Sequence, residues 1–229
     1  ERLVAETPNA YRPNQYANPS NPASHVATTG PEIWRQTDGR ITHFVAGAGT
    51  CGTLTGVARY LKDANPNVRI VAADPEGSVF SGGSGRPYLV EGVGEDFFPD
   101  AWEADLYDEI IPVSDADSFG MARRVARTEG ILVGGSGGMA VAAAIQVARA
   151  AGPDDVVVVL NPDSGRGYLS KLFNDEWMAN FGFTTADGPT LAEALDLAGG
   201  TRALLYVNPE APVREAIDVM RAHGVSQLP

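Results

Sequence analysis

Hydrophobic positions along the chain follow two different spacings. Short apolar runs rich in β-branched residues predict strands at residues 41–46, 68–73, 110–113 and 155–160. The intervening apolar or alanine-rich segments predict helices at residues 24–36, 53–61, 117–128 and 139–151. The run at 155–160 is apolar on both faces, as expected of a strand covered by helices on either side. This alternation predicts an α/β fold with a mostly parallel, doubly wound sheet.

The alternating pattern ends near residue 183, and the remaining chain is organised differently. Residues 184–202 begin and end with groups of turn-forming Gly and Pro, and they predict a linker with one short helix. A strand at 203–207 and an amphipathic helix then open a second, smaller βα unit over residues 203–229. The sequence lacks an initial Met and stops inside this pattern, so we expect it to be a fragment of a longer protein.

The net charge and the cysteine content limit which partners the protein can bind and in which cellular compartment it is expected. The formal net charge of -12 would repel phosphate backbones and anionic lipid, so neither nucleic acid nor a membrane is an expected partner. The single cysteine, Cys51, permits no intramolecular disulfide, and no segment has the pattern of a signal peptide or a membrane span. We therefore expect a cytoplasmic protein. The three histidines share no ligand spacing, and no metal site is expected.

A glycine-rich loop, Gly47-Ala48-Gly49-Thr50-Cys51-Gly52, separates the first predicted strand from the helix that starts at residue 53. It matches the GxGxxG pattern, and Asp74 ends the next strand at a spacing close to that of dinucleotide-binding folds. Small residues at a helix N-terminus expose backbone N–H groups that favour a phosphate. Thr50 and Thr53 add hydroxyl donors, which suit a terminal phosphate better than a pyrophosphate. A simple tight turn is the alternative.

A second loop, Gly134-Gly135-Ser136-Gly137-Gly138, follows a short apolar run and precedes the helix predicted from Met139. Two such loops on a parallel sheet would converge at the carboxyl ends of its strands, where doubly wound folds bind ligands. Alternatively, Ser136 caps the helix and has no other role.

Five segments occur in an order that resembles a known family. They are NQYANPSNPASH at 14–25, GAGTCGTLTG at 47–56, VEGVGEDF at 90–97, GGSGG at 134–138 and NPDSGRGYLSKLF at 161–173. The chain resembles the pyridoxal-phosphate (PLP) dependent β-replacement enzymes, which include cysteine synthases and cystathionine β-synthases. The resemblance covers residues 1–183, about the latter two-thirds of that family's catalytic core, and implies its tryptophan-synthase-β-like fold, fold type II.

The resemblance also implies roles for individual residues. Those that would hold the PLP phosphate are Gly49, Thr50, Cys51, Gly52 and Thr53. Those near the substrate carboxylate and the cofactor ring would be Gln15, Asn18, Gly92 and Gly94. Ser136 would contact the pyridine nitrogen, and its hydroxyl would leave the ring a weaker electron sink than a carboxylate would, which suits loss of a β-substituent.

Some positions depart from the family's usual pattern. Family members usually have Gly at the position of Cys51. A small residue tolerated in place of that Gly is the favoured interpretation, and a reactive thiol beside a helix N-terminus is the alternative. Glu95 stands where some members have an aromatic residue in the cavity. No catalytic residue is assigned within the chain, because the family's Schiff-base lysine would precede Glu1 and matches neither Lys62 nor Lys171.

The implied reaction is PLP-dependent β-replacement on L-serine with L-homocysteine, which forms cystathionine in transsulfuration and cysteine biosynthesis. The alternative within the family is a cysteine synthase that uses O-acetylserine and sulfide. Outside the family, a Rossmann NAD-dependent oxidoreductase and a non-catalytic nucleotide-sensing fragment remain open. The chain alone is expected to be inactive.

The segment at 204–229 resembles the start of the regulatory repeat named after cystathionine β-synthase. Pairs of this repeat bind adenine nucleotides or S-adenosylmethionine, so an adenosyl ligand is an expected partner beside the amino-acid substrates. We interpret residues 203–229 as a truncated first repeat. Since the family is commonly dimeric, we also expect a homodimer or a higher homo-oligomer.

Overall fold

The computed structural model describes residues 2–184, 205–208 and 210–224, and the chain divides into two compact units, Glu1–Thr185 and Ala186–Pro229. In the first unit, parallel strands form one sheet in the order β3-β2-β1-β4. The strands are β1 (His43–Gly47), β2 (Arg69–Pro75), β3 (Glu109–Val113) and β4 (Val157–Val159). The predicted α/β class and the parallel sheet are confirmed.

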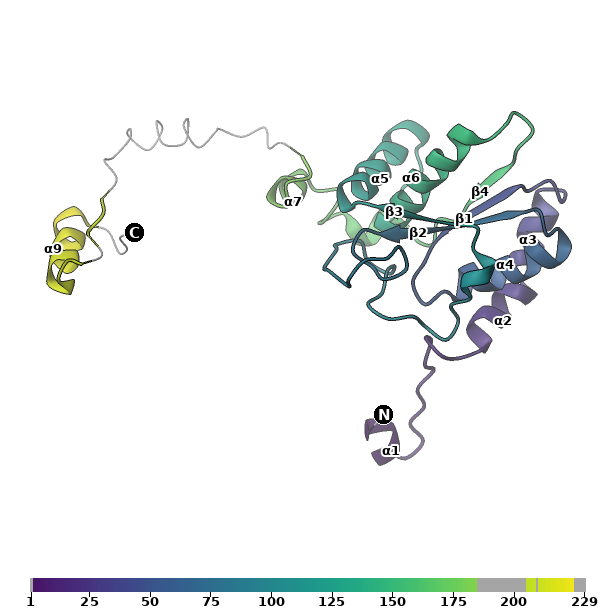
Figure 1. Cartoon of the computed structure of the whole chain (residues 1–229), viewed down its shortest axis with the longest axis horizontal. Helices are drawn as coiled ribbons and strands as arrows, with labels where there is room; N and C mark the ends of the chain where they lie inside the picture. Colours follow the sequence, from purple (N-terminus) through teal and green to yellow (C-terminus); the bar gives the residue numbers. More distant parts are fainter. Residues whose placement is uncertain (1, 185–204, 209, 225–229) are drawn as a thin grey trace. The chain divides into compact units, whose positions relative to one another are not determined.

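Helices cover both faces of this sheet (Figure 1). One face packs against α4 (Gly52–Ala64), and the other packs against α5 (Asp115–Glu129) and α6 (Gly135–Ala150). Neighbouring residues of β1 enter different cores, since Phe44 packs on the α4 side and Val45 on the α5 and α6 side. The sheet is therefore doubly wound, as predicted.

The order of the strands indicates where in the sheet a ligand site is expected. From β1 the chain proceeds to β2 and β3 on one side, and it later returns to place β4 on the other side of β1. In parallel sheets, such a reversal opens a crevice at the carboxyl ends of the strands. The segments that follow β1 and β4 meet at this crevice.

Two helix predictions need correction. The helix expected over 24–36 is two helices, α2 (Ser20–Ala27) and α3 (Thr29–Gln36), separated at Thr28. A continuous helix cannot pass this point, because Pro31 has no N–H and its ring would clash with the carbonyl four residues earlier. Likewise, α6 starts at Gly135 rather than at Met139, so most of the predicted second glycine loop is helical.

The strand expected at 155–160 is also shorter and less covered than predicted. It contains Val157–Val159, and these valines are only half-buried. Within the described residues, β4 pairs with β1 alone and is an edge of the sheet, so one side of the strand has no neighbour.

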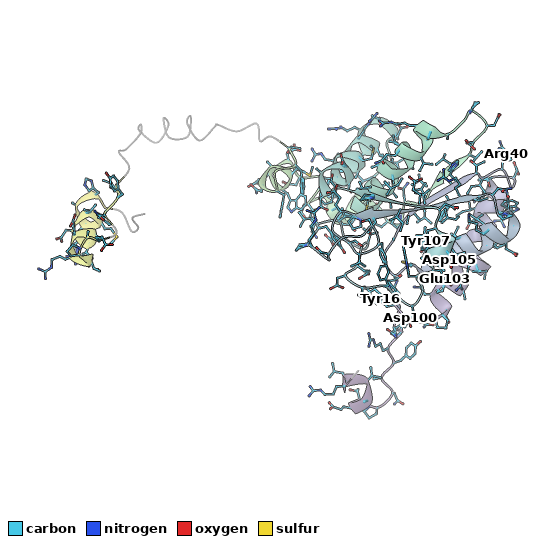
Figure 2. All side chains as sticks on the ribbon, in the orientation of Figure 1. Tyr16, Arg40, Asp100, Glu103, Asp105 and Tyr107 are labelled. Atoms are coloured by element: carbon cyan, nitrogen blue, oxygen red, sulfur yellow. The ribbon has the colours of Figure 1, made fainter. Side chains whose placement is uncertain are left out.

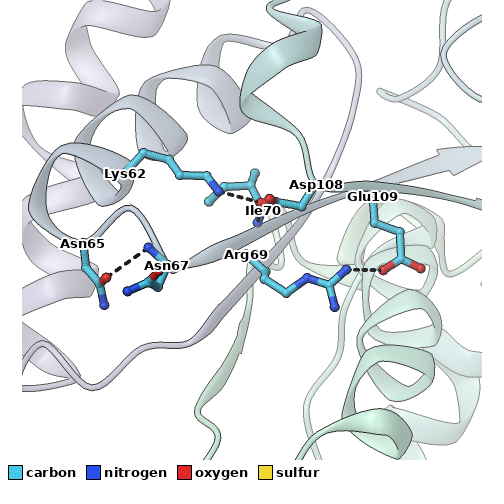
Figure 3. A network of polar contacts seen from close by, with 7 residues as sticks. All are labelled: Lys62, Asn65, Asn67, Arg69, Ile70, Asp108 and Glu109. Carbon is cyan, nitrogen blue, oxygen red and sulfur yellow. Dashed lines mark hydrogen bonds and ion pairs between the residues drawn. The ribbon is translucent and has the colours of Figure 1, made fainter.

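The amino ends of the strands are tied together far from the crevice (Figure 3). Lys62 in α4 forms an ion pair with Asp108 at 2.8 Å, and the same carboxylate accepts a hydrogen bond from Ile70 N at 2.7 Å. Burial opposes ionisation of Asp108, but the bonds from Lys62 and Ile70 outweigh it and lower the pKa of this carboxyl. Arg69 pairs with Glu109 at 3.2 Å on the neighbouring strands.

The shorter helices of the first unit are α1 (Arg2–Glu6), η1 (Ala104–Leu106), η2 (Gly165–Tyr168) and α7 (Asp175–Asn180). In the second unit, α9 (Val213–His223) ends at Gly224, which has a φ of 65°. The strand predicted at 203–207 is wrong for residues 205–207, which form none, and residues 203 and 204 lie outside the described residues. Most of the predicted linker at 184–202 also lies outside them. No helix in the described ranges has the length and apolar character needed to cross a membrane.

Candidate functional site

A cavity of about 510 Å³ opens at the crevice between β1 and β4. Its walls come from four parts of the chain, residues 15–16, 46–47 with 49–54, 92–95, and 160 with 162. Its volume is within the range of about 300–1,000 Å³ that is typical of small-molecule sites. Of the predicted site residues, the loop Gly49 to Thr53, Gln15, Gly92 and Gly94 are brought together here.

The start of α4 presents backbone donors to this cavity. Cys51 is the N-cap of α4, and no side chain caps the helix. The first backbone N–H groups of α4 therefore have no side-chain acceptor, and Gly52 and Thr53, which carry them, line the cavity. Together with the helix dipole, these donors favour a phosphate dianion. The hydroxyls of Thr50 and Thr53 lie in the same wall.

Glycines are required here because another segment approaches the loop closely. A Cβ atom at Gly49 would lie 2.9 Å from the carbonyl oxygen of Gly92. The N–H of Gly94 donates to Ala48 O at 2.7 Å and closes the contact. Gly92 has a φ of 80°, a conformation that favours glycine, and its backbone forms part of the cavity wall.

Asn21 is a site residue that the sequence analysis did not identify. Its Nδ2 donates to Gln15 O at 3.0 Å and to Thr50 Oγ1 at 3.2 Å, which ties the entry loop to the glycine loop. A Cβ atom at Gly52 would overlap the Asn21 amide, so this pair requires glycine. Asn21 lies in the segment 14–25 that carried the resemblance, but nothing separates it there from the neighbouring asparagines.

His25 supports the same wall from behind. Its Nε2 is hydrogen-bonded to Thr53 Oγ1 at 3.1 Å and its Nδ1 to Thr29 Oγ1 at 2.9 Å. Burial lowers the pKa of His25, so the neutral ring is favoured at physiological pH. The histidine acts as a structural link between α2, α3 and α4. Among the described residues, no group of three or more His, Cys, Asp and Glu side chains is arranged to bind a metal ion.

Cys51 is a buried structural thiol. Its φ of 63° lies in the left-handed region, a conformation that favours glycine and strains other residues. The side chain is 3% exposed, and Sγ donates to Gly49 O at 3.2 Å. Burial raises the pKa of Cys51 to about 12, and the nearby Glu95 and Asp74 add to the increase. The interpretation of Cys51 as a reactive thiol is wrong, because the thiolate is disfavoured.

Two predicted site residues do not line this cavity. Asn18 uses both ends of its amide within the entry loop, with Nδ2 donating to Pro13 O and Oδ1 accepting from Ser20 N, each at 2.9 Å. Ser136 is buried in the first turn of α6, whose N-cap is Gly134. The capping alternative for Ser136 is therefore wrong, and its contact with a cofactor ring stays a prediction.

The chain's two lysines also lie outside the cavity wall. Lys62 pairs with Asp108 at the opposite end of the strands, and Lys171 pairs with Glu91. Both ammonium groups are therefore committed to carboxylates elsewhere. The location of the Schiff-base lysine before Glu1 stays a prediction.

Comparison with known proteins identifies the family. A family model described as pyridoxal-phosphate dependent enzyme matches residues 1–163. Cystathionine β-synthases of Dictyostelium discoideum and Oryctolagus cuniculus are 40% and 37% identical over all of this chain, which spans 49% and 43% of those proteins. The cystathionine β-synthase of Apis mellifera is 40% identical over 80% of this chain and 37% of that protein.

A solved structure agrees with these matches. The crystal structure of an O-acetylserine-dependent cystathionine β-synthase from Helicobacter pylori has a TM-score of 0.72 and 39% identity, over 74% of this chain and 56% of that one. The oxidoreductase interpretation of Gly47 to Gly52 is wrong, because the loop lies within the matched PLP-enzyme region. By its sequence and its fold, the chain belongs to the family of pyridoxal-phosphate dependent enzymes.

Proposed function

We propose that the chain is part of an enzyme that replaces the hydroxyl of L-serine with the thiol of L-homocysteine, to form cystathionine and water. The observation that carries this proposal is the uncapped start of α4 within a cavity at the switch point of the sheet. The names of the relatives support the choice of reaction. Because the chain spans about half or less of those relatives, the activity is proposed for the whole protein.

The residues of this cavity fit PLP. When bound, PLP supplies the electron sink that allows the β-substituent of an amino acid to leave. The N–H groups at Gly52 and Thr53 and the hydroxyl of Thr50 hold its phosphate, and Asn21 keeps this wall in place. Each charge-assisted hydrogen bond to the phosphate contributes about 1.5–3 kcal/mol.

Other residues orient the substrate and the ring. Gln15 contacts the substrate carboxylate, Asn18 holds the entry loop that carries Gln15, and Ser136 contacts the pyridine nitrogen. The backbone of Gly92 and Gly94 forms a wall that excludes water from the reacting face. Apart from that of Asn18, these are the roles that the resemblance implies, and all of them are proposed for this chain.

A second candidate reaction uses O-acetylserine as the first substrate. The Helicobacter pylori relative, which carries that dependence in its name, favours it. The test is to incubate full-length, PLP-loaded protein with each first substrate, L-serine or O-acetylserine, and each second substrate, homocysteine or sulfide. Mass spectrometry should detect cystathionine from serine and homocysteine, whereas cysteine from O-acetylserine and sulfide alone would overturn the proposal.

We also propose that residues 204–229 begin a regulatory repeat that binds an adenosyl ligand. The described helix α9 is amphipathic, with Val219 and Met220 partly buried among polar positions. Calorimetric titration of the full-length protein with S-adenosylmethionine, ATP and AMP should detect binding of one of them. The same preparation should be a homodimer or a larger homo-oligomer by light scattering.

A further inference from the structure

One carboxylate stands out in the cavity wall. Among the described residues that line it, Glu95 is the only one with a carboxyl side chain, and none is a lysine or an arginine. The other titratable groups are Tyr16 and Cys51, and both stay neutral because their pKa values are raised, chiefly by burial. The rest of the wall is formed by glycine, threonine, glutamine and apolar residues.

The charged group that shifts the pKa of Glu95 is another carboxylate, Asp96, and not a cation. The ion pairs in the described part of the chain engage other carboxylates, including that of the neighbouring Glu91 with Lys171. The charge of Asp96 repels the charge of Glu95. Burial and this repulsion raise the pKa of Glu95, and the Tyr16 hydroxyl bond opposes the increase. A cation that entered the cavity would therefore meet a carboxyl group whose ionised form it would stabilise.

The backbone of Glu95 is held on both sides. Its N–H donates to Ser78 Oγ at 3.1 Å, and its carbonyl accepts from Val79 N at 3.0 Å. The preceding residue, Gly94, donates to Ala48 O in the glycine loop. These three hydrogen bonds fix the backbone at this point and therefore the place of the Glu95 side chain in the cavity wall.

The carboxylate itself is oriented by Tyr16. The Tyr16 hydroxyl donates to Glu95, and its ring packs against Phe97 with centroids 5.2 Å apart. The Tyr16 carbonyl accepts a hydrogen bond from Asp100 N at 3.1 Å, and Figure 2 labels both residues on their two loops. The acceptor is thus prepared before a ligand arrives, which lowers the entropic cost of binding.

The cavity therefore has two regions that prefer ligand groups of opposite charge. The start of α4 attracts an anion, while Glu95 attracts a cation and repels an anion. In the proposed reaction, the amino group of the first amino acid reacts with the cofactor and is not free as an ammonium group. The second amino acid keeps its α-ammonium group, whereas hydrosulfide carries only negative charge.

We propose that Glu95 binds the α-ammonium group of the second, thiol-bearing amino acid and thereby selects homocysteine over sulfide. This inference rests on the proposed function. Tyr16 is a positioning residue that orients the Glu95 carboxylate. The chemistry recognised is a thiol on a zwitterionic amino acid, and a thiol without the ammonium group lacks the interaction.

The test compares three second substrates on full-length, PLP-loaded protein: L-homocysteine, 4-mercaptobutyrate, which is homocysteine without its amino group, and sulfide. Glu95→Gln should raise KM for homocysteine about tenfold, as expected for the loss of one charge-assisted hydrogen bond. KM for 4-mercaptobutyrate and for sulfide should stay the same or fall. Tyr16→Phe should give the same selectivity with a smaller change, and it serves as the second variant if Glu95→Gln does not fold.

Asp96→Asn is the matched control, because it removes one carboxylate from the adjacent residue outside the cavity wall. Its removal relieves the repulsion that raises the pKa of Glu95 and leaves the Glu95 carboxylate in place, so all three KM values should stay within about twofold. Calorimetry adds a readout without turnover, in which Glu95→Gln should weaken the binding of L-cystathionine about tenfold at equal PLP content. An equal loss for homocysteine and 4-mercaptobutyrate, or no loss for either, overturns the inference alone. If the wild-type protein uses sulfide and never homocysteine, the proposed function and this inference both fall.

Discussion

The helices α4 and α6 both begin in glycine-rich segments that follow an apolar run, but their glycines meet different neighbours. At α4, Gly49 is approached by the carbonyl of Gly92, and Gly52 faces the amide of Asn21 in a wall of the cavity. At α6, the first turn itself is packed on α5, where a Cβ at Gly138 would overlap the carbonyl of Ser118. One set of glycines shapes a ligand site, and the other allows two helices to approach.

This comparison predicts its largest effect at α6. Gly138→Ala forces a methyl group against the α5 backbone and should lower the free energy of unfolding by about 2–3 kcal/mol. Gly120→Ala in α5 is the matched control, because a Cβ there meets nothing within 4 Å. This control should stabilise the helix by about 0.5–1 kcal/mol. Urea unfolding of both variants measures the difference, and equal changes would show that α6 does not depend on close packing.

At α4, substitution of a glycine is expected to lower the affinity for PLP rather than the stability of the fold. Gly52→Ala displaces the Asn21 amide and should weaken PLP binding about tenfold or more through the loss of phosphate hydrogen bonds. Adding Asn21→Ala to this variant removes the overlapping atoms and should restore part of the affinity. Fluorescence titration of the full-length protein with PLP measures both. Unchanged affinity in Gly52→Ala would mean that this wall does not hold the phosphate.

The smallest effect is expected at Cys51, the N-cap of α4. Cys51→Ala removes the buried sulfur but keeps the left-handed backbone strain, whereas Cys51→Gly removes both. The Gly variant should therefore be more stable than the Ala variant by about 1 kcal/mol. This order is the reverse of that expected at Gly120, where alanine is favoured. Thermal unfolding of both variants measures the order of their stabilities. Equal stability of the Ala and Gly variants would argue against backbone strain at this residue.

Local patterns were sufficient for the outline of the fold. The runs at 41–46 and 68–73 locate β1 and β2 within two residues at each end, because a buried strand needs a continuous apolar segment. The start of α6 was misplaced because it depends on a contact with Ser118, which no local pattern contains. The half-exposed β4 reflects its place at an edge, which is a property of the sheet and not of the strand.

The sequence predicted where the candidate site lies better than it predicted which residues are hydrogen-bonded to one another there. The glycine loop at 47–52 reaches the cavity as a strand, a loop and a helix start should. Asn21 was missed because its partner Thr50 lies 29 residues away, and the amide has no local signature. That Glu95 is the only carboxyl group in the wall is likewise visible only when the whole wall is assembled.

Because β4 pairs with β1, the cavity wall is complete only after the ribosome has synthesised the residues of β4 and those that follow it. Thr42 Oγ1 donates to Val156 O, a contact between residues 114 positions apart, and Leu160 and Pro162 complete the wall beyond it. At about 5–20 residues per second, a ribosome releases α4 several seconds before these last residues. A cofactor that needs the complete wall can therefore stabilise only chains that have already closed the sheet.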